Sequence, residues 1–278
     1  MTRHVAGGTG DGVTRQAVRH RGDGVTQIVV IAKEPVPGRV KTRLCPPFTP
    51  EQAAGLAAAA LEDTLRTVAD AGPRHRVLAL RGVPGPWLPD GFDVIAQRGD
   101  GLDQRIAAAF TDAHERRPGP VVLIGMDTPQ VTPALLRVAC AALGRYDAVF
   151  GPAADGGWWL LGLRRPDPAL LLGVPMSVPE TGAAQLRRLR QAGLSVAAMP
   201  ELRDVDTAAD AARVAALAPG TRFAAALRAV GGASRVVDGA SRSVGDVPRV
   251  VDGVPRIVDG AWQVVGGASR AAGPANGS

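Results

Sequence analysis

The stretch that most constrains this fold is residues 27–44, QIVVIAKEPVPGRVKTRL. The apolar run at 28–31 is β-branched throughout and too short for a helix, so it predicts a buried strand of an α/β sheet. Prolines and a glycine then force a loop that carries Arg39, Lys41 and Arg43 within five residues. Ligands of open α/β sheets bind beyond the carboxyl ends of strands, and a basic, glycine-bearing loop there suits a phosphate-rich ligand.

A solvated surface patch is the alternative interpretation of these cations. Holding charged side chains on a proline-stiffened loop costs conformational entropy, however, which favours a functional use. The loop is neither a Walker loop nor a G-x-G-x-x-G turn, so neither an ATPase nor a dinucleotide-binding site follows from it.

The remaining pattern alternates strands and helices, and it predicts one α/β domain over residues 27–218, with a mostly parallel sheet between helices. Short apolar runs predict strands, and amphipathic stretches that begin with capping residues predict helices. The strands are expected at 28–31, 77–80, 93–96, 120–125, 147–150, 158–161 and 195–198, and the helices near 50–71, 133–143, 180–192 and 207–217, with a further helix that starts near 102. Asp100 and Asp103 are expected to serve the second helix as a cap and a dipole complement.

The two ends of the chain differ from this domain. Residues 1–26 are polar, Gly-rich and repetitive, which predicts a disordered leader. Residues 219–278 predict a short helix followed by a low-complexity tail, in which R-V-V-D-G recurs. The ends carry eleven arginines against six aspartates, so the domain itself is nearly neutral although the chain is +6 overall.

This charge distribution argues against nucleic-acid binding, because no basic face with interleaved aromatics accompanies it. The two cysteines, Cys45 and Cys140, cannot form a disulfide framework or a zinc site, and no histidines cluster. No signal peptide and no run long enough to span a membrane is evident, so a soluble cytoplasmic protein is expected.

Asp127 is the acidic residue that the pattern favours most as a ligand. It follows the most continuously apolar strand, at 120–125, so it is expected beside the basic loop if the two strands are parallel neighbours. The alternative is that Asp127 caps the turn at Thr128-Pro129.

Asp204 and Asp206 form a second acidic pair, whose i, i+2 spacing in an extended segment places both on one side and suits a divalent cation. Either could instead cap the helix that follows. The turn Asp155-Gly156-Gly157-Trp158 has two glycines that would let backbone approach a ligand closely. Trp158 and Trp159 alternate faces on a strand, so one is expected in the core and the other is available to stack on a base or sugar.

These motifs together resemble a known family. The run A-K-x-P-x-P-G-x-V-K-T-R-L at 32–44 is similar to the opening signature of GT-A-like transferases called rSAM/selenodomain-associated transferases, often labelled glycosyltransferases. They are related to molybdenum cofactor and phospholactate guanylyltransferases. The segments G-x-D-x-P at 125–129, D-G-G-aromatic at 155–158 and D-V-D-T-x-x-D at 204–210 also match. One segment departs, since the family commonly has Trp-Ser-Thr where this chain has Met176-Ser177-Val178.

The resemblance implies a GT-A, Rossmann-like nucleotide-diphospho-sugar transferase fold that uses Mg²⁺ or Mn²⁺. Lys41 and Asp127 would be catalytic, and the metal would be held by Asp127, Asp204 and Asp206. The nucleotide and its phosphates would be bound by Lys33, Gly38, Arg39, Lys41, Arg43, Asp155, Gly156, Gly157 and Trp158. The partners would be a nucleotide or nucleotide-sugar and a small acceptor. Glycosyl transfer, nucleotidyl transfer with release of pyrophosphate, and a catalytically silent phospho-ligand-binding domain all remain open, as do the base, the acceptor and the oligomeric state.

Overall fold

A seven-stranded sheet in the order β3-β2-β1-β4-β6-β5-β7 forms the centre of the computed structural model, which describes residues 26–235, 253–258 and 261–266. Its strands are β1 (Gln27–Lys33), β2 (His75–Arg81), β3 (Asp93–Ala96), β4 (Val121–Ile124), β5 (Ala148–Pro152), β6 (Trp158–Leu163) and β7 (Val196–Ala198). The helices are α1 (Pro50–Ala71), α2 (Leu102–Arg116), α3 (Pro133–Ala142), α4 (Thr181–Gln191), α5 (Ala208–Leu217) and α6 (Arg222–Arg235), with short 3-10 turns η1 (Thr42–Leu44) and η2 (Pro168–Leu170). All the predicted strands are present, and the mixed α/β fold with its mostly parallel sheet is confirmed.

The order in which successive strands are placed in the sheet reverses at β1. This strand pairs in parallel with β2 on one side and with β4 on the other, while β6 runs antiparallel to both β4 and β5. Strands β2 and β3 therefore lie on one side of β1, and β4 is the first strand on the other side. Such a topological switch point is where open α/β sheets bind ligands.

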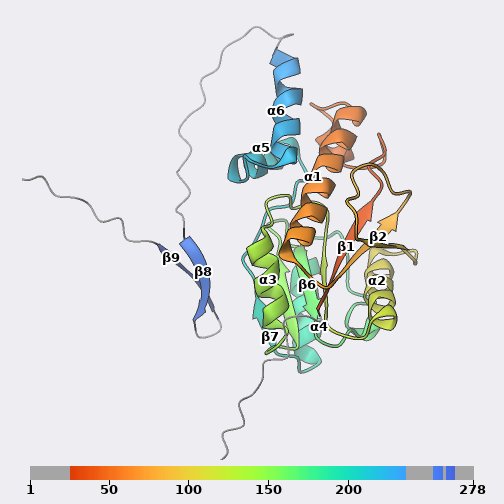
Figure 1. Ribbon diagram of the computed structural model, residues 1–278, viewed down its shortest axis with the longest axis vertical. Helices are drawn as coiled ribbons and strands as arrows, with labels where there is room; N and C mark the ends of the chain where they lie inside the picture. Colours follow the sequence, from red (N-terminus) through yellow and green to blue (C-terminus); the bar gives the residue numbers. More distant parts are fainter. Residues whose placement is uncertain (1–25, 236–252, 259–260, 267–278) are drawn as a thin grey trace, which may run out of the picture.

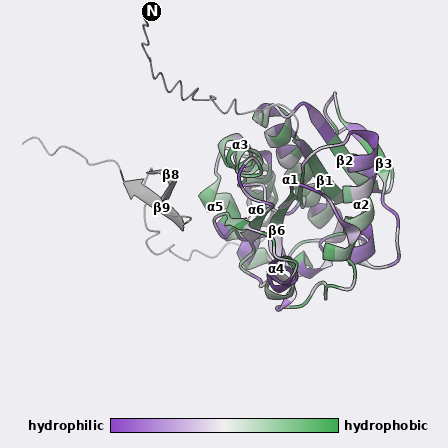
Figure 2. Ribbon diagram, turned by 90° about the horizontal axis from the view of Figure 1, so that it is seen from below, coloured by the Kyte–Doolittle hydropathy of each residue, from purple (hydrophilic) through white to green (hydrophobic). Residues whose placement is uncertain are grey.

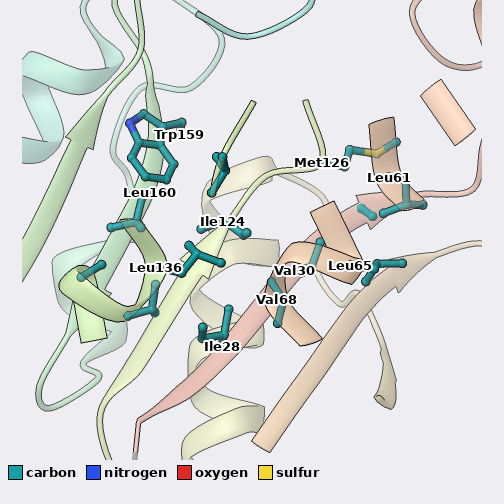
Figure 3. Close-up of a cluster of buried hydrophobic side chains, with 14 of the residues drawn as sticks. Ile28, Val30, Leu61, Leu65, Val68, Ile124, Met126, Leu136, Trp159 and Leu160 are labelled. Carbon is teal, nitrogen blue, oxygen red and sulfur yellow. The ribbon is translucent and has the colours of Figure 1, made fainter. Parts of the chain in front are cut away.

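The strand residues alternate between two hydrophobic layers, because successive side chains of a strand point to opposite faces. On one face Ile28 and Val30 pack with α1 and α3, as the close-up in Figure 3 shows. On the other face Val29 packs with α2 and α4. The helices thus cover both faces (Figure 1), and strands β1 and β6 lie inside the molecule in Figure 2. This three-layer arrangement leaves the strand ends uncovered, where open α/β sheets build their sites.

Three threonines cap helices. Thr49 forms a reciprocal capping box with Gln52 at α1, Thr132 caps α3, and Thr207 caps α5. Two expectations are wrong. The residue at the start of α2 is Gly101, without a side-chain cap, so Asp100 does not serve there. The N-cap of α5 is Thr207, so neither Asp204 nor Asp206 caps this helix.

Helix α6 extends the packed part of the chain beyond the expected boundary at residue 218. Its Phe223 is 1% exposed and joins a third hydrophobic cluster with residues of α1 and α5. The buried carboxylate of Asp63 on α1 accepts hydrogen bonds from the backbone N–H groups of Arg222 and Phe223, at 3.1 and 2.8 Å. A side chain distant in sequence therefore satisfies the first turn of α6.

Asp63→Ala is expected to lower the free energy of unfolding by about 1–2 kcal/mol, because it leaves two N–H groups at a helix start without their acceptor. Denaturant unfolding measures the change. The matched control is Asp70→Ala, at an exposed carboxylate on the same helix, which should change little. Equal stability of the two variants would show that Asp63 does not hold α6.

Two strands lie in the segment that the sequence predicts to be a low-complexity tail. They are β8 (Gly253–Val258) and β9 (Ala261–Gly266), paired antiparallel, and this pairing was not predicted. The predicted leader and the other tail residues lie outside the described part of the chain. Within that part, no helix is long and apolar enough to cross a membrane.

Candidate active site at the ends of β1 and β4

A cavity of about 620 Å³ opens at the carboxyl ends of β1 and β4, and its size falls within the range of small-molecule sites. The predicted residues that line it are Lys33, Arg39, Lys41 and Arg43 after β1, Asp127 after β4, Asp155, Gly157 and Trp158 around the β5–β6 turn, and Asp204 and Asp206 before α5. Four distant segments thus meet at the switch point. Gly38 and Gly156 are the predicted residues that do not line the cavity.

Lys41 is held rigidly between two buried anchors of the basic loop. Val40 and Leu44 are 8% and 0% exposed, which fixes the loop to the body of the domain. Lys41 itself has a left-handed backbone, with φ 48° and ψ 38°, an unfavourable conformation for a residue with a Cβ atom. Such strain is found mainly where surrounding structure enforces it, often at functional sites.

The side chain of Lys41 pairs with Asp127. Its Nζ lies 2.9 Å from Oδ1 of Asp127, and the two side chains are 12% and 39% exposed. The parallel pairing of β1 and β4 brings them together, as the sequence predicts, because both residues follow the carboxyl end of their strand. The site therefore contains a fixed ammonium group beside a carboxylate that solvent can still reach.

A second ion pair closes the same edge of the cavity. Arg43 lies 2.6 Å from Oδ2 of Asp206, and this hydrogen bond and charge raise the pKa of Arg43. Both side chains are well exposed, so the pair adds little to stability. Its effect is to set the basic loop opposite the segment before α5.

The two acidic segments are tied side by side through the backbone. The N–H of Val205, which lies between the two aspartates of the second pair, donates to the carbonyl oxygen of Asp127 at 2.9 Å. The pKa of the half-buried Asp204 is raised to about 6, first by burial and then by the charge of Asp155, with a smaller contribution from Asp127. The three carboxylates therefore repel one another across one cavity.

The chemistry of these donors fits Mg²⁺ or Mn²⁺, which prefer carboxylate oxygens. The raised pKa of Asp204 shows that its negative charge is under-compensated, and a cation would relieve this. Within the described residues, no three His, Cys, Asp or Glu side chains are yet arranged as a metal-binding group. Asp127 and Asp206 are each paired with a cation, but it is the charge of Asp127 that reaches Asp204, so Asp127 and Asp204 fit one metal ion best.

In metal-free buffer, Asp204→Asn is expected to raise the free energy of unfolding at pH 8 by on the order of 1–2 kcal/mol, reduced by partial solvent exposure. Between its unfolded pKa near 4 and its folded pKa of about 6, Asp204 holds its proton more tightly when folded. The stability of the wild-type protein relative to Asp204→Asn therefore falls as the pH rises through this window. Thermal melts from pH 4 to 8 with EDTA measure the difference, and a constant difference would contradict it.

The Asp155–Gly157 turn is fixed against the start of α4. Oδ1 of Asp155 accepts from the N–H of Gly157 at 2.8 Å, and the carbonyl of Gly156 accepts from Gly182 at 2.8 Å. Gly156 has φ 88°, and a Cβ atom there would lie 2.0 Å from the carbonyl oxygen of Pro179. The expectation that Gly156 lets backbone approach a ligand is therefore corrected, because it lets the turn approach its own chain.

The tryptophan pair divides as the alternation predicts. Trp159 is 3% exposed, packs in the core shown in Figure 3, and donates through Nε1 to the carbonyl of Pro200. Trp158 is only partly buried and lines the cavity. The ring of Trp158 thus forms the part of the cavity wall next to the Asp155–Gly157 turn.

Gln97 and Arg105 are among the polar residues of the cavity that were not selected from the sequence. Gln97 follows β3 directly, and its amide donates to the carbonyls of Ala32 and Ala79 at 2.7 and 2.9 Å. Arg105 holds the loop before α2 through the carbonyls at 99 and 100. The rule that selected Asp127, a polar residue directly after a strand, could also have found Gln97.

Comparisons with known proteins show which sequences and folds this chain is similar to. Residues 55–178 match the model of the family described as "Uncharacterized protein conserved in bacteria (DUF2064)". A crystal structure from Desulfovibrio desulfuricans G20, provisionally assigned as a nucleotide-diphospho-sugar transferase, is similar, with 28% identity and a TM-score of 0.69. The match covers 77% of this chain and 98% of that one. A search of the curated proteins found no match.

Two further solved structures are more distant. Rv0371c from Mycobacterium tuberculosis H37Rv is 22% identical over 69% of this chain and 97% of that one, with a TM-score of 0.44. The 2-C-methyl-D-erythritol 4-phosphate cytidylyltransferase from Thermus thermophilus is 17% identical over 70% and 99%, with a TM-score of 0.43. The sheet topology and the Desulfovibrio structure together show that this chain has the Rossmann-like α/β fold of nucleotide-diphospho-sugar transferases.

Proposed function

We propose that the protein is a divalent-metal-dependent glycosyltransferase that uses a nucleotide-sugar donor and a small acceptor. The observation that carries this proposal is the pairing of Lys41 with Asp127 at the switch point of the sheet, inside a cavity of ligand size. Cations on one side and carboxylates on the other suit a diphosphate together with a metal ion. The Desulfovibrio structure supports the choice through its assigned class.

The cationic side chains would bind the donor phosphates. Lys33, Arg39 and Arg43 are exposed and can move onto phosphate oxygens, whereas Lys41 is held by its loop. Asp127 and Asp204 would hold Mg²⁺ or Mn²⁺, which would supply positive charge to the departing diphosphate. The polar turn at 155–157 and the Trp158 ring would bound the sugar.

The reaction would be a displacement at the anomeric carbon. A new bond forms between the acceptor oxygen and that carbon, and the bond from the carbon to the phosphate oxygen breaks. The electron pair leaves with the nucleoside diphosphate, and the acceptor proton passes to water. Lys41 would stabilise the negative charge on the leaving group, because it is a preorganised cation in a partly enclosed site.

Nucleotidyl transfer is the second candidate, and the number of cations favours it. Four basic side chains, that of Lys33 at the end of β1 and three in the loop after it, line the cavity, which is enough to bind a triphosphate. In that reaction an acceptor oxygen attacks the α-phosphorus of a nucleoside triphosphate and pyrophosphate leaves. A silent domain would bind the same ligands without turnover.

A thermal-shift screen of nucleotides and nucleotide-sugars, with and without Mg²⁺ or Mn²⁺, tests the proposal. A ligand at about 100 times its Kd stabilises the folded state by about 2.7 kcal/mol. We expect a nucleotide-sugar to raise Tm only when metal is present. The absence of any shift with every nucleotide would contradict the proposal.

A further inference from the structure

The cavity has an apolar end that a phosphate-binding site does not require. Its lining on this side comes from the hydrophobic cluster between the sheet and helices α2 and α4, and consists of Ile31, Ile106, Trp158 and Met176. Most of the charged residues are anchored elsewhere, since Val40 and Val205 beside them belong to the clusters that involve α1. The exception is Arg105 on α2, whose guanidinium donates to the carbonyls at 99 and 100. The cavity thus crosses the end of the sheet, charged on one side and apolar on the other.

Two exposed hydrophobic side chains enlarge this apolar end. Leu102 at the start of α2 is 38% exposed, and Val178 before α4 is 40% exposed. Both line the cavity. Large apolar side chains that face solvent together in a concave site gain from a ligand that removes them from water.

Hydrogen bonds hold the two walls of this end in place. Oδ2 of Asp103, next to Leu102, accepts from the N–H of Gly173 at 2.9 Å and so joins α2 to the segment before α4. The N–H of Val178 donates to Oγ1 of the buried Thr181 at 3.2 Å. The apolar end is therefore preorganised, as a specific binding site needs to be.

Ser177 places one hydroxyl group between these apolar side chains. Among the described residues other than glycine, only Lys41 and Ser177 have a positive φ, and both line the cavity. At φ 60° Ser177 is strained, and it is exposed between Met176 and Val178. The apolar end thus offers a hydrogen-bonding group that can orient a ligand hydroxyl.

We propose that this apolar end binds the acceptor, and that the acceptor is an alcohol or phenol whose hydroxyl is carried by an aromatic or alkyl body. This inference rests on the proposed glycosyl transfer. Leu102, Met176 and Val178 would cover the apolar body, and Ser177 would contact the hydroxyl. Sugars and phosphorylated acids bind such a surface poorly, because their polar groups would be buried without partners.

Binding of 2-naphthol, with glucose and 3-phosphoglycerate as polar comparisons, tests the acceptor class by calorimetry on the full chain. We expect 2-naphthol to bind more tightly than either polar compound. Met176→Ser should weaken its affinity about tenfold, and Met176→Leu should restore it, because the loss is one of apolar burial. The matched control is Leu172→Ser, at an exposed leucine on the neighbouring loop outside the cavity.

Val178→Ser repeats the test at a side chain that is exposed, so folding does not depend on it. Unchanged 2-naphthol affinity in both serine variants, or tighter binding of glucose or 3-phosphoglycerate, would overturn the acceptor inference. Nucleotide binding is measured separately on the wild-type protein. Its absence would overturn the proposed donor site, whereas nucleotide binding without 2-naphthol binding would overturn only the acceptor inference.

Discussion

Asp127→Asn is expected to abolish metal-dependent nucleotide binding while the domain stays folded. The amide keeps the size of the side chain but loses the charge that a divalent cation needs. It also leaves the ammonium of Lys41, 2.9 Å away, without its counter-charge. The fold should survive, because the side chain is 39% exposed and the backbone carbonyl of Asp127 still accepts from Val205.

Calorimetric titration with a nucleoside diphosphate, in Mn²⁺ and in EDTA, measures this effect. The matched control is Asp90→Asn, at an exposed carboxylate outside the cavity, which should bind like the wild-type protein. Thermal melts of both variants check folding. Wild-type affinity of Asp127→Asn in EDTA and in Mn²⁺ alike would remove Asp127 from the metal site.

Lys41→Ala is expected to weaken nucleotide binding by roughly 1.5–3 kcal/mol, the range for a hydrogen bond to a charged group. Alanine also carries a Cβ atom, so the left-handed backbone is equally strained in both proteins and the change reports the ammonium group. Val40 and Leu44 remain buried to hold the loop.

The same titration measures the loss, with Arg74→Ala as the control because Arg74 is exposed and lies outside the cavity. If Lys41→Ala keeps its affinity and melts normally, the cationic loop is a surface patch, which is the alternative that the sequence left open.

The sequence predicted the elements whose cause is local. β-Branched apolar runs specify strands β1 and β4, and the Thr49–Gln52 box specifies the start of α1. Lys41 and Asp127 could be placed together because both follow buried strands, and parallel strands end at the same edge. These inferences need only periodicity, turn chemistry and one topological rule.

The features that the sequence could not supply depend on contacts between distant segments. Asp206 meets Arg43 rather than capping a helix, because the loops after β1 and before α5 adjoin. Gly156 is needed because α4 packs against its turn. The sequence predicts a short helix after residue 218, but not that Asp63 on α1 completes the first turn of that helix, α6.

The raised pKa of Asp204 is another feature that the sequence could not supply. Nothing in the D-V-D-T pattern separates it from Asp206, yet Asp204 has a pKa raised to about 6 while Asp206 forms an exposed ion pair. The causes are first the burial of Asp204 and then the charge of Asp155, with a smaller contribution from Asp127. Electrostatic roles of this kind follow from the assembled cavity and not from spacing along the chain.

The products formed from the two donor classes test the central claim most directly. The protein is incubated with Mg²⁺ and an aromatic alcohol, once with a panel of nucleotide-sugars and once with nucleoside triphosphates, and the phosphates are separated by anion-exchange chromatography. The account predicts release of nucleoside diphosphate from one nucleotide-sugar, abolished by EDTA and by Asp127→Asn. Release of pyrophosphate from a triphosphate, with every nucleotide-sugar left intact, would contradict glycosyl transfer.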